Sequence, residues 1–383
     1  MSEENDRISP VRVLHVIGAM DRGGAESLIM NLYRKIDRNI IQFDFLVHED
    51  RRCDFDEEIL ELGGRIYRTF RFNGLNYFSY CKSCADFFSN HNDYVAVHVH
   101  IGSCAAMVIR GAKRHGLYTI AHSHNTNPPL SILELGFRVF SFPTRYLADC
   151  FLACSEEAGR DRFGKRVVSS AAFSVLNNGI DVEQYRFCPE KRKEIRKQVA
   201  LDDETLAICH IGRFSEEKNH IFLLKVFASL MERTEKKIVL CLIGRGPLEE
   251  KIKKEASDMG IQDDVRFFGV RSDVPNLLMG MDCFIFPSIW EGLGIAAIEA
   301  QASGLPSVLS PALPRIAFCS RTAIRATGLD DPFCWADLAM SAILNAGDRE
   351  ICADEVIKAG FDISRSAKKV TTLYLEHRLE EGK

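Results

Sequence analysis

The sequence predicts an α/β protein with two domains, each built around a parallel, doubly wound sheet. Its length of 383 residues exceeds what one ordinary hydrophobic core supports, so two domains are expected. Short β-rich runs alternate with helical patterns along the chain, which is the order that a parallel sheet requires. The runs that open the two halves, Val11–Ile17 and Leu206–Ile211, end at Gly18 and Gly212. The two halves therefore begin with the same strand-to-loop arrangement, although their sequences do not otherwise repeat.

The composition is that of a globular protein, with 46% hydrophobic and 27% charged residues. A net charge of −4, with no long run of Lys and Arg, gives no reason to expect nucleic acid as a partner. The 13 cysteines are odd in number and scattered, which favours a reducing cytoplasm over a disulfide framework. Residues 1–10 carry no apolar signal-peptide core, and no apolar run approaches the length of a transmembrane helix. We therefore expect a cytoplasmic protein that is soluble or rests on a membrane from outside.

The sequence of Val11–Ile17 alternates and is rich in β-branched residues, which predicts a first strand. A loop with two glycines, Gly23 and Gly24, connects it to a helical pattern over residues 25–36. A strand, a glycine loop and a helix together are typical of an anion site. The dinucleotide fingerprint would need three spaced glycines, and a plain tight turn explains this loop equally well.

Histidines gather where the later strands of the first half end. The strands that the sequence predicts there cover residues 43–47, 65–69, 96–100 and 118–121. His98 and His100 lie at one carboxyl end and His122 and His124 at another, the edge where such sheets bind ligands. Two His-x-His pairs could bind a metal, but no carboxylate or cysteine pattern accompanies them, so we predict no metal ligand. Contact with a polar substrate, with His124 best placed, is preferred, and histidines satisfied within the fold are the alternative.

Residues 131–151 combine an apolar face with two arginines, Arg138 and Arg145. Such a face can rest on an anionic membrane surface. An ordinary core helix that is broken near Pro143 is the other interpretation, because proline removes a helical hydrogen bond.

The sequence predicts that the first domain ends with a strand near residues 174–178. The charged stretch Pro189–Gln198 is then expected to be a linker with a helical piece. The strands predicted for the second domain are Leu206–Ile211 and residues 239–243, 265–270, 283–287 and 307–310. A glycine turn with Gly244 and Gly246 follows the second of these strands and is expected to wrap a nucleotide. Val270, at the end of the third, is expected to meet its base.

The loop after Leu206–Ile211 carries two cations, Arg213 and Lys218, just past the end of a strand. Arginine offers a planar fork of donors and lysine a point charge, a combination suited to a diphosphate. A solvated surface loop is the alternative, but the position at a strand end favours phosphate contact.

The strongest pattern in the chain is a strand, a glycine turn and a helix over residues 283–302. The strand stops at Pro287, Gly292 and Gly294 make the turn, and Ile295–Ala302 consists of good helix formers. The first amides of such a helix face outward and favour phosphate. Glu291 and Glu299 would stand about 12 Å apart at about 1.5 Å per helical residue. That separation is too long for one acid/base pair but suits the two ends of an elongated ligand.

These motifs together resemble the GT-B glycosyltransferases of family GT4. The matching pieces are Gly23–Glu26, Gly212–Phe214 with Lys218–Asn219, Gly244–Leu248, Glu291–Gly294 with Glu299, and Ala302–Pro306. The resemblance covers nearly the whole chain and is strongest between Ile208 and Ser310. The stretch His122–Asn125 looks most like the branch that makes capsular polysaccharides and exopolysaccharides.

The resemblance implies two Rossmann-like domains that face a cleft, with boundaries at 1–188 and 189–363, and a C-terminal helix at 364–383 that crosses back. It implies that Glu299 holds the ribose, that Glu291 and the amides of Gly292, Leu293, Gly294 and Ile295 meet the sugar and phosphate, and that Arg213 and Lys218 bind the diphosphate. Gly23 and Gly24 would approach that diphosphate. His122, His124 and Asn125 would form the acceptor side, with His124 catalytic beside Glu291, Arg213 and Lys218.

By the same resemblance the enzyme is retaining and needs no metal or other cofactor. Its donor would be a UDP-sugar, and its acceptor a saccharide or lipid-linked saccharide at the inner membrane face. Retention usually requires a nucleophilic carboxylate with a second carboxyl group close by, and the sequence offers no such pair. We therefore predict a same-face displacement in which the leaving phosphate deprotonates the acceptor hydroxyl. Two features depart from the family pattern, namely Trp290 before the first glutamate and the lack of an acidic residue in the loop after Pro311.

Two alternatives remain at the level of the sequence. A nucleotide-sugar epimerase of the same fold would need acid/base residues around one sugar carbon, and none stand out. A non-catalytic partner subunit that binds a nucleotide sugar would not need all four of Arg213, Lys218, Glu291 and Glu299.

Overall fold

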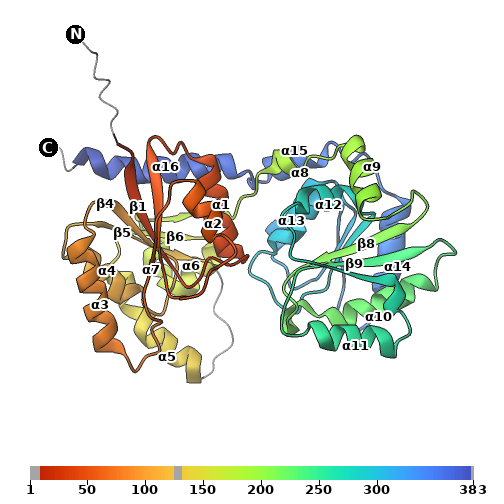
Figure 1. Ribbon diagram of the computed structural model, residues 1–383, viewed down its shortest axis with the longest axis horizontal. Helices are drawn as coiled ribbons and strands as arrows, with labels where there is room; N and C mark the ends of the chain where they lie inside the picture. Colours follow the sequence, from red (N-terminus) through yellow and green to blue (C-terminus); the bar gives the residue numbers. More distant parts are fainter. Residues whose placement is uncertain (1–8, 125–131, 381–383) are drawn as a thin grey trace, which may run out of the picture. The chain divides into compact units, whose positions relative to one another are not determined.

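The structure is a computed structural model and describes residues 9–124 and 132–380. The chain divides into two compact units, one of Met1–Gly179 with Ile363–Lys383 and one of Ile180–Asp362 (Figure 1). Each unit is an α/β body around its own parallel sheet, so the fold class that the sequence predicts is confirmed. Within the described residues, no helix combines the length and apolarity needed to cross a membrane.

The sheet of the first unit has the strand order β3-β2-β1-β4-β5-β6-β7. Its strands are β1 (Val11–Ile17), β2 (Ile41–Val47), β3 (Ile66–Arg68), β4 (Tyr94–Val99), β5 (Tyr118–Ser123), β6 (Cys150–Ala153) and β7 (Phe173–Val175). Successive residues of β1 serve opposite faces, since Val13 packs into one hydrophobic cluster and Leu14 into another. The strand order reverses between β1 and β4, and open sheets bind ligands beyond the strand ends at such a point.

Helices cover both faces of this sheet. They are α1 (Gly24–Lys35), α2 (Asp56–Glu61), α3 (Tyr77–Asn90), α4 (Ala105–Lys113), α5 (Ile132–Ser141), the 3₁₀ helix η1 (Phe142–Tyr146), α6 (Glu156–Phe163), α7 (Lys165–Val168) and the C-terminal α16 (Ile363–Glu380). The last helix, blue in Figure 1, packs on α1 and β4 and buries Val370 and Tyr374 in the core of the first unit. The predicted return of the C-terminal helix to the first domain is therefore present.

The sheet of the second unit has the order β10-β9-β8-β11-β12-β13 and repeats the reversal between β8 and β11. Its strands are β8 (Leu206–Ile211), β9 (Ile238–Ile243), β10 (Val265–Gly269), β11 (Cys283–Phe286), β12 (Ser307–Leu309) and β13 (Ala323–Arg325). Its helices are α8 (Val182–Tyr185), α9 (Pro189–Gln198), η2 (Glu216–Lys218), α10 (His220–Met231), α11 (Glu249–Asp258), η3 (Gln262–Asp264), α12 (Val274–Gly280), α13 (Ile295–Ala302), η4 (Arg315–Ala317), α14 (Pro332–Leu344) and α15 (Cys352–Lys358).

Three details of the sequence prediction are corrected. The strand β6 lies in a stretch for which the sequence predicted only helix. The strand β13 follows β12, although the strand at residues 307–310 was the last one predicted for the second domain. The stretch Pro189–Gln198 is not a linker, because α9 packs on α12 and Arg196 pairs with Asp282 at 3.1 Å. The helix break near Pro143 is confirmed, since α5 ends at Ser141 and η1 begins with Phe142.

Candidate active site

Lys218 and Glu291 form an ion pair at the reversal point of the second sheet. Lys218 ends η2, which follows β8, and Glu291 lies in the loop after β11. Strands β8 and β11 are neighbours, so their carboxyl ends bring these two loops together. The side chains are mostly buried, with 18% and 14% of their surface exposed. The sequence treated them as separate functional residues, and the structure joins them.

Further contacts fix the geometry of this pair. Ser288 donates a hydrogen bond of 3.2 Å from Oγ to Glu291 Oε1, the same oxygen that Lys218 approaches. The Lys218 ammonium lies 4.9 Å from the ring centroid of Phe286, a cation–π arrangement. The amide of Ile289 donates to the carbonyl of Glu217 at 2.8 Å, which ties the two loops through the backbone. The pair is therefore held in place before any ligand arrives.

Helix α13 begins immediately beyond this pair. Gly294 caps it with φ of +74°, a left-handed conformation that glycine adopts without strain. A Cβ at this position would also collide with Leu313. The first amides of α13 lack intrahelical partners, and with the helix dipole they form an anion-binding end. The position of Lys218 near this end gives a region suited to a phosphate.

Glu299 lies one turn into α13 and is held by a residue that the sequence did not single out. Tyr185, the last residue of α8, donates a hydrogen bond of 2.8 Å from Oη to Glu299 Oε1. Burial raises the pKa of Glu299 above its usual range, and the bond from Tyr185 opposes that rise. One oxygen of the carboxylate is thus oriented by protein, and its other oxygen makes no hydrogen bond with the residues that the structure describes.

The glycine turn after β9 packs against the loop that carries Arg213. Gly244 has φ of +138°, and a Cβ there would meet the carbonyl oxygen of Gly212. A Cβ on Gly246 would meet the backbone of Phe214. Phe214 donates from its amide to the carbonyl of Arg245 at 3.0 Å. These glycines therefore allow close approach of two protein loops, and contact with a nucleotide stays a prediction for Gly244 and Gly246.

In the first unit, a pocket of about 290 Å³ opens at the reversal point of the sheet. It is lined by His100, His122 and His124 from the ends of β4 and β5, and by Glu26 of α1. Burial raises the pKa of Glu26 to about 7. The predicted acceptor-side histidines therefore share one pocket with a carboxyl group of the Gly23–Glu26 motif.

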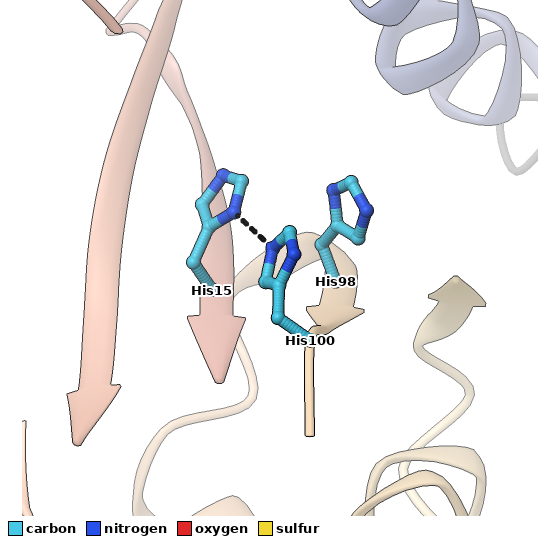
Figure 2. A group of neighbouring side chains, drawn as sticks. All are labelled: His15, His98 and His100. Atoms are coloured by element: carbon cyan, nitrogen blue, oxygen red, sulfur yellow. Dashed lines mark hydrogen bonds between the residues drawn. The ribbon is translucent and has the colours of Figure 1, made fainter. Parts of the chain in front are cut away.

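The histidines continue behind this pocket as a cluster of five, because His15 of β1 and His98 of β4 join them. His15 Nδ1 lies 3.0 Å from His100 Nε2, and His100 Nδ1 lies 2.8 Å from His124 Nε2. His98 Nε2 lies 3.2 Å from His122 Nδ1. Figure 2 shows His15, His98 and His100, with the hydrogen bond between His15 and His100 dashed. We call these residues the histidine cluster.

Burial keeps the histidine cluster neutral at physiological pH. It lowers the pKa of His15 to about 3 and that of His124 to about 4. The pKa values of His98, His100 and His122 lie well below the usual range, first because of burial and then because of the neighbouring imidazoles. The hydroxyl of Tyr374 in α16 bonds His98 Nδ1 at 2.7 Å and closes the inner end of the cluster.

The remaining predicted residues are distributed around these two sites. Arg213 is exposed on the loop after β8, and Val270 is 40% exposed beyond β10. Asn125 lies outside the described residues. Sequence reasoning missed Tyr185, Ser288, His15 and Glu26 as site residues, although Ser288 and Glu26 stand inside motifs that it had singled out. Tyr185 and His15 carry no motif, and only the packing of α8 and the pairing of β1 with β4 reveal them.

Comparison with known proteins gives a consistent result. The family model described as "Glycosyl transferases group 1" matches residues 191–316, and "Glycosyltransferase Family 4" matches residues 22–184. EpsF of Bacillus subtilis, a protein named as a glycosyltransferase, is 33% identical over 96% of this chain and 97% of its own. UDP-Gal:alpha-D-GlcNAc-diphosphoundecaprenol alpha-1,3-galactosyltransferase of Escherichia coli is 30% identical over 37% of this chain and 38% of its own.

Among solved structures, HepE of Anabaena in complex with UDP and glucose is similar in fold. It superposes with a TM-score of 0.77 at 17% identity and covers 96% of this chain and 100% of its own. The relationship to EpsF extends over nearly the whole of both chains at an identity that establishes the family. This chain belongs to the group 1 glycosyltransferases of family 4, has the GT-B fold and is a glycosyltransferase.

Proposed function

We propose that this glycosyltransferase moves a sugar, with retention of anomeric configuration, from a UDP-sugar to a saccharide or lipid-linked saccharide in the synthesis of a surface polysaccharide. The observation that carries the proposal is the Lys218–Glu291 pair at the N-terminal end of α13, with the oriented carboxylate of Glu299 further along the same helix. The cation and the anion-binding helix end suit the diphosphate of a nucleotide sugar. The two separated carboxylates suit the hydroxyl groups on either side of it, those of the ribose and those of the sugar.

Each group has a role in donor binding. The diphosphate lies against the first amides of α13 with Lys218 and Arg213 as its cations. The free oxygen of Glu299 accepts the ribose hydroxyls, and Glu291 accepts a hydroxyl of the sugar. The structure of HepE in complex with UDP and glucose supports uridine as the nucleotide through similarity of fold.

The reaction breaks the bond between the anomeric carbon and the diphosphate oxygen. The departing diphosphate gains negative charge, which Lys218, Arg213 and the dipole of α13 stabilise as it develops. A phosphate oxygen then takes the proton of the acceptor hydroxyl, whose oxygen forms the new bond on the same face of the sugar. Glu291 is paired with Lys218 and hydrogen-bonded to Ser288, which supports a positioning role over that of a nucleophile.

No metal is needed for transfer in this account, and no other cofactor. A metal ion in such enzymes neutralises the leaving diphosphate, and here protein groups supply that charge. In the second unit, Lys218, Arg213 and the N-terminal end of α13 therefore take the role of a divalent ion at the donor site.

The acceptor side is proposed at the pocket of the first unit, with His124 at the acceptor and His122 behind it. The name of the Escherichia coli relative describes a lipid-diphosphate acceptor, which supports a lipid-linked acceptor here. Exposed apolar side chains on α3, α5 and η1 support peripheral contact with the cytoplasmic face of a membrane.

The test is hydrolysis or transfer with a panel of nucleotide sugars, measured as release of the free nucleotide. We expect one UDP-sugar to turn over. Lys218→Ala should lower the rate by at least about 100-fold, because it removes a charge that stabilises the leaving diphosphate. Glu291→Ala should also lower the rate, because it removes the acceptor for a hydroxyl of the sugar and the partner of Lys218. The variant Lys225→Ala, on the neighbouring helix α10, is the matched control and should retain the wild-type rate.

Three outcomes contradict the proposal. Conversion of the donor to its epimer without an acceptor would indicate an epimerase. A wild-type protein that is inert with every donor would indicate a partner subunit. A trapped glycosyl–enzyme adduct would replace same-face displacement with a double displacement.

A further inference from the structure

The histidine cluster has a property that donor or acceptor binding does not require: its nitrogen atoms converge on two points. The ring nitrogens of His15, His98 and His100 lie within 4.8 Å of one another, as do those of His100, His122 and His124. Figure 2 shows the first of these sets, with His15 on β1, His98 on β4 and His100 just beyond the carboxyl end of β4. In a tetrahedral zinc site with bonds of about 2.0–2.1 Å, ligand nitrogens stand about 3.3 Å apart. The observed atoms, which lie within 4.8 Å of one another, would therefore have to move together by at most about 1.5 Å to bind an ion.

Three nitrogens of the cluster have no hydrogen-bond partner among the described residues. They are His15 Nε2, His122 Nε2 and His124 Nδ1, and all three are buried. A buried polar atom without a partner costs free energy, so native structures usually provide one, either from the protein or from a bound water or ion. Two of these nitrogens, His122 Nε2 and His124 Nδ1, belong to the set formed with His100, so that set has buried nitrogen donors to offer to a ligand.

The chemistry of the donors selects the class of occupant. The cluster offers imidazole nitrogens, which suit Zn²⁺ and its neighbours in the transition series, whereas Mg²⁺ and Ca²⁺ prefer oxygen. Both ring nitrogens of His100 are hydrogen-bonded, so an ion bound by this residue would replace its contact of 2.8 Å with His124 Nε2.

Access distinguishes the two sets. His100, His122 and His124 line the pocket of about 290 Å³, whereas His15 and His98 do not. Glu26 lines the same pocket, so a carboxylate is available on the open side of the outer set. His15 and His98 then stand behind as hydrogen-bonded supports for His100 and His122, as outer groups do in known metal sites.

We propose that His100, His122 and His124 form a binding site for a transition-metal ion of the Zn²⁺ class, with the remaining coordination position open to the pocket. The ion would join the ends of β4 and β5. Because His124 is also the proposed acceptor residue, an ion bound here would compete with the acceptor. The site is separate from the donor groups of the second unit and is not a requirement for transfer. The proposal depends only on the histidine geometry, so it stands or fails independently of the proposed function.

The test is titration of the full chain, freed of metal by a chelator, with Zn²⁺ and with Co²⁺. We expect one ion per chain, a rise in melting temperature with Zn²⁺, and a Co²⁺ spectrum of low-coordinate nitrogen ligation without a thiolate charge-transfer band. The spectrum matters because the chain contains 13 cysteines, which could bind these ions elsewhere. It also tests the proposal on wild-type protein, where no substitution can disturb folding.

Substitutions locate the ion. We expect His122→Ala and His124→Ala each to weaken Zn²⁺ binding by more than the 10- to 100-fold that loss of an outer supporting group costs. His15→Ala should weaken it within that smaller range. His115→Ala, in the turn after α4, is the matched control and should leave the affinity unchanged. Failure of the wild type to bind, thiolate ligation of Co²⁺, or equal affinity in the His122, His124 and His115 variants would overturn the proposal.

Discussion

Tyr185 and Glu299 show how a single hydroxyl can set the state of a ligand-binding carboxylate. Tyr185 reaches Glu299 from α8, four residues long, and its bond of 2.8 Å lowers a pKa that burial would otherwise raise further. The ribose needs an ionised acceptor at Glu299. The hydroxyl therefore influences the pH range over which the donor binds, although it touches only the carboxylate.

Substitution Tyr185→Phe tests this role. Without the bond, the pKa of Glu299 rises, so donor affinity should fall at a higher pH as the solution is acidified. At neutral pH we expect the KM for the donor to rise about 3- to 10-fold, matching the roughly 1 kcal/mol of one hydrogen bond. The measurement is the pH profile of kcat/KM. Tyr146→Phe, at an exposed tyrosine, is the control and should keep the wild-type profile. An acid limb in Tyr185→Phe that is identical to that of the wild type would contradict the proposed role of the hydroxyl.

His220 gives a prediction about stability. Its ring is buried at the start of α10, and burial lowers its pKa to about 4. The unfolded chain binds a proton below about pH 6.5, whereas the folded state does not until about pH 4. The second unit should therefore lose about 1.4 kcal/mol per pH unit from this residue as pH falls through that window, and nothing above it.

His220→Leu should reduce that acid sensitivity. The measurement is denaturant unfolding at pH 7 and pH 5, followed by tryptophan fluorescence, because both tryptophans of the chain, Trp290 and Trp335, lie in the second unit. His115→Leu, in the first unit, is the control and should leave the slope as in the wild type. An unchanged slope in His220→Leu would show that this histidine does not titrate as expected.

At the scale of elements, the turn into α13 depends on its glycine. Gly294→Ala combines a positive φ with a collision against Leu313, so we expect a loss of about 1–3 kcal/mol in unfolding free energy. Gly24→Ala is the matched comparison, because it also stands at a helix start but a Cβ there meets no atom within 4 Å. Its effect on stability should stay within about 0.5 kcal/mol. Equal losses, measured by thermal unfolding, would refute this account of the turn.

A second element-level feature is an apolar surface on α3, α5 and the segments beside them. Its exposed members are Leu75, Phe78, Leu135, Val139, Phe142 and Tyr146. The elements adjoin, since Phe140 of α5 stacks on Tyr77 of α3 at 6.2 Å between ring centroids. The guanidinium of Arg145 lies 4.1 Å from the ring centroid of Phe142, which places a cation beside the apolar surface.

We expect the chain to co-sediment with vesicles that contain anionic phospholipid. The double variant Leu75→Ser, Phe78→Ser should reduce vesicle binding about 10-fold. This corresponds to about 1.4 kcal/mol, the free energy expected if the two side chains are only partly buried in the lipid. Leu344→Ser removes another exposed leucine, from the second unit, and should bind as wild type. Equal binding by all three proteins would exclude this surface as the contact.

At the scale of the whole molecule, the sequence predicted both sheets because their strands are short, β-rich and closed by glycine or proline. It missed β6 because this strand continues the apolar stretch 131–151 that was interpreted as a helix, and β13 because its three residues, Ala323–Arg325, include only one β-branched residue. It interpreted α9 as part of a linker because Pro189–Gln198 is highly charged. The buried contact of Arg196 with Asp282 that binds this helix to its unit is tertiary.

The site shows the same division. Glu291, Glu299, Arg213 and Lys218 stand in local motifs, so the sequence could identify them. The bond from Tyr185 and the convergence of His15 with the other histidines join segments that are far apart in the chain, 114 residues in the case of Tyr185 and Glu299. Such contacts follow from strand order and helix packing, which no local pattern encodes.

The central claim is that the second unit binds a nucleotide sugar at α13, and a donor-dependent thermal shift tests it most directly. A UDP-sugar at about 100 times its Kd should add about 2.7 kcal/mol, or a rise of several degrees in the melting temperature of that unit. Lys218→Ala and Glu299→Ala should abolish the rise, and Lys225→Ala should keep it. No shift in the wild type with any nucleotide sugar, or an undiminished shift in Lys218→Ala and Glu299→Ala, would contradict the account.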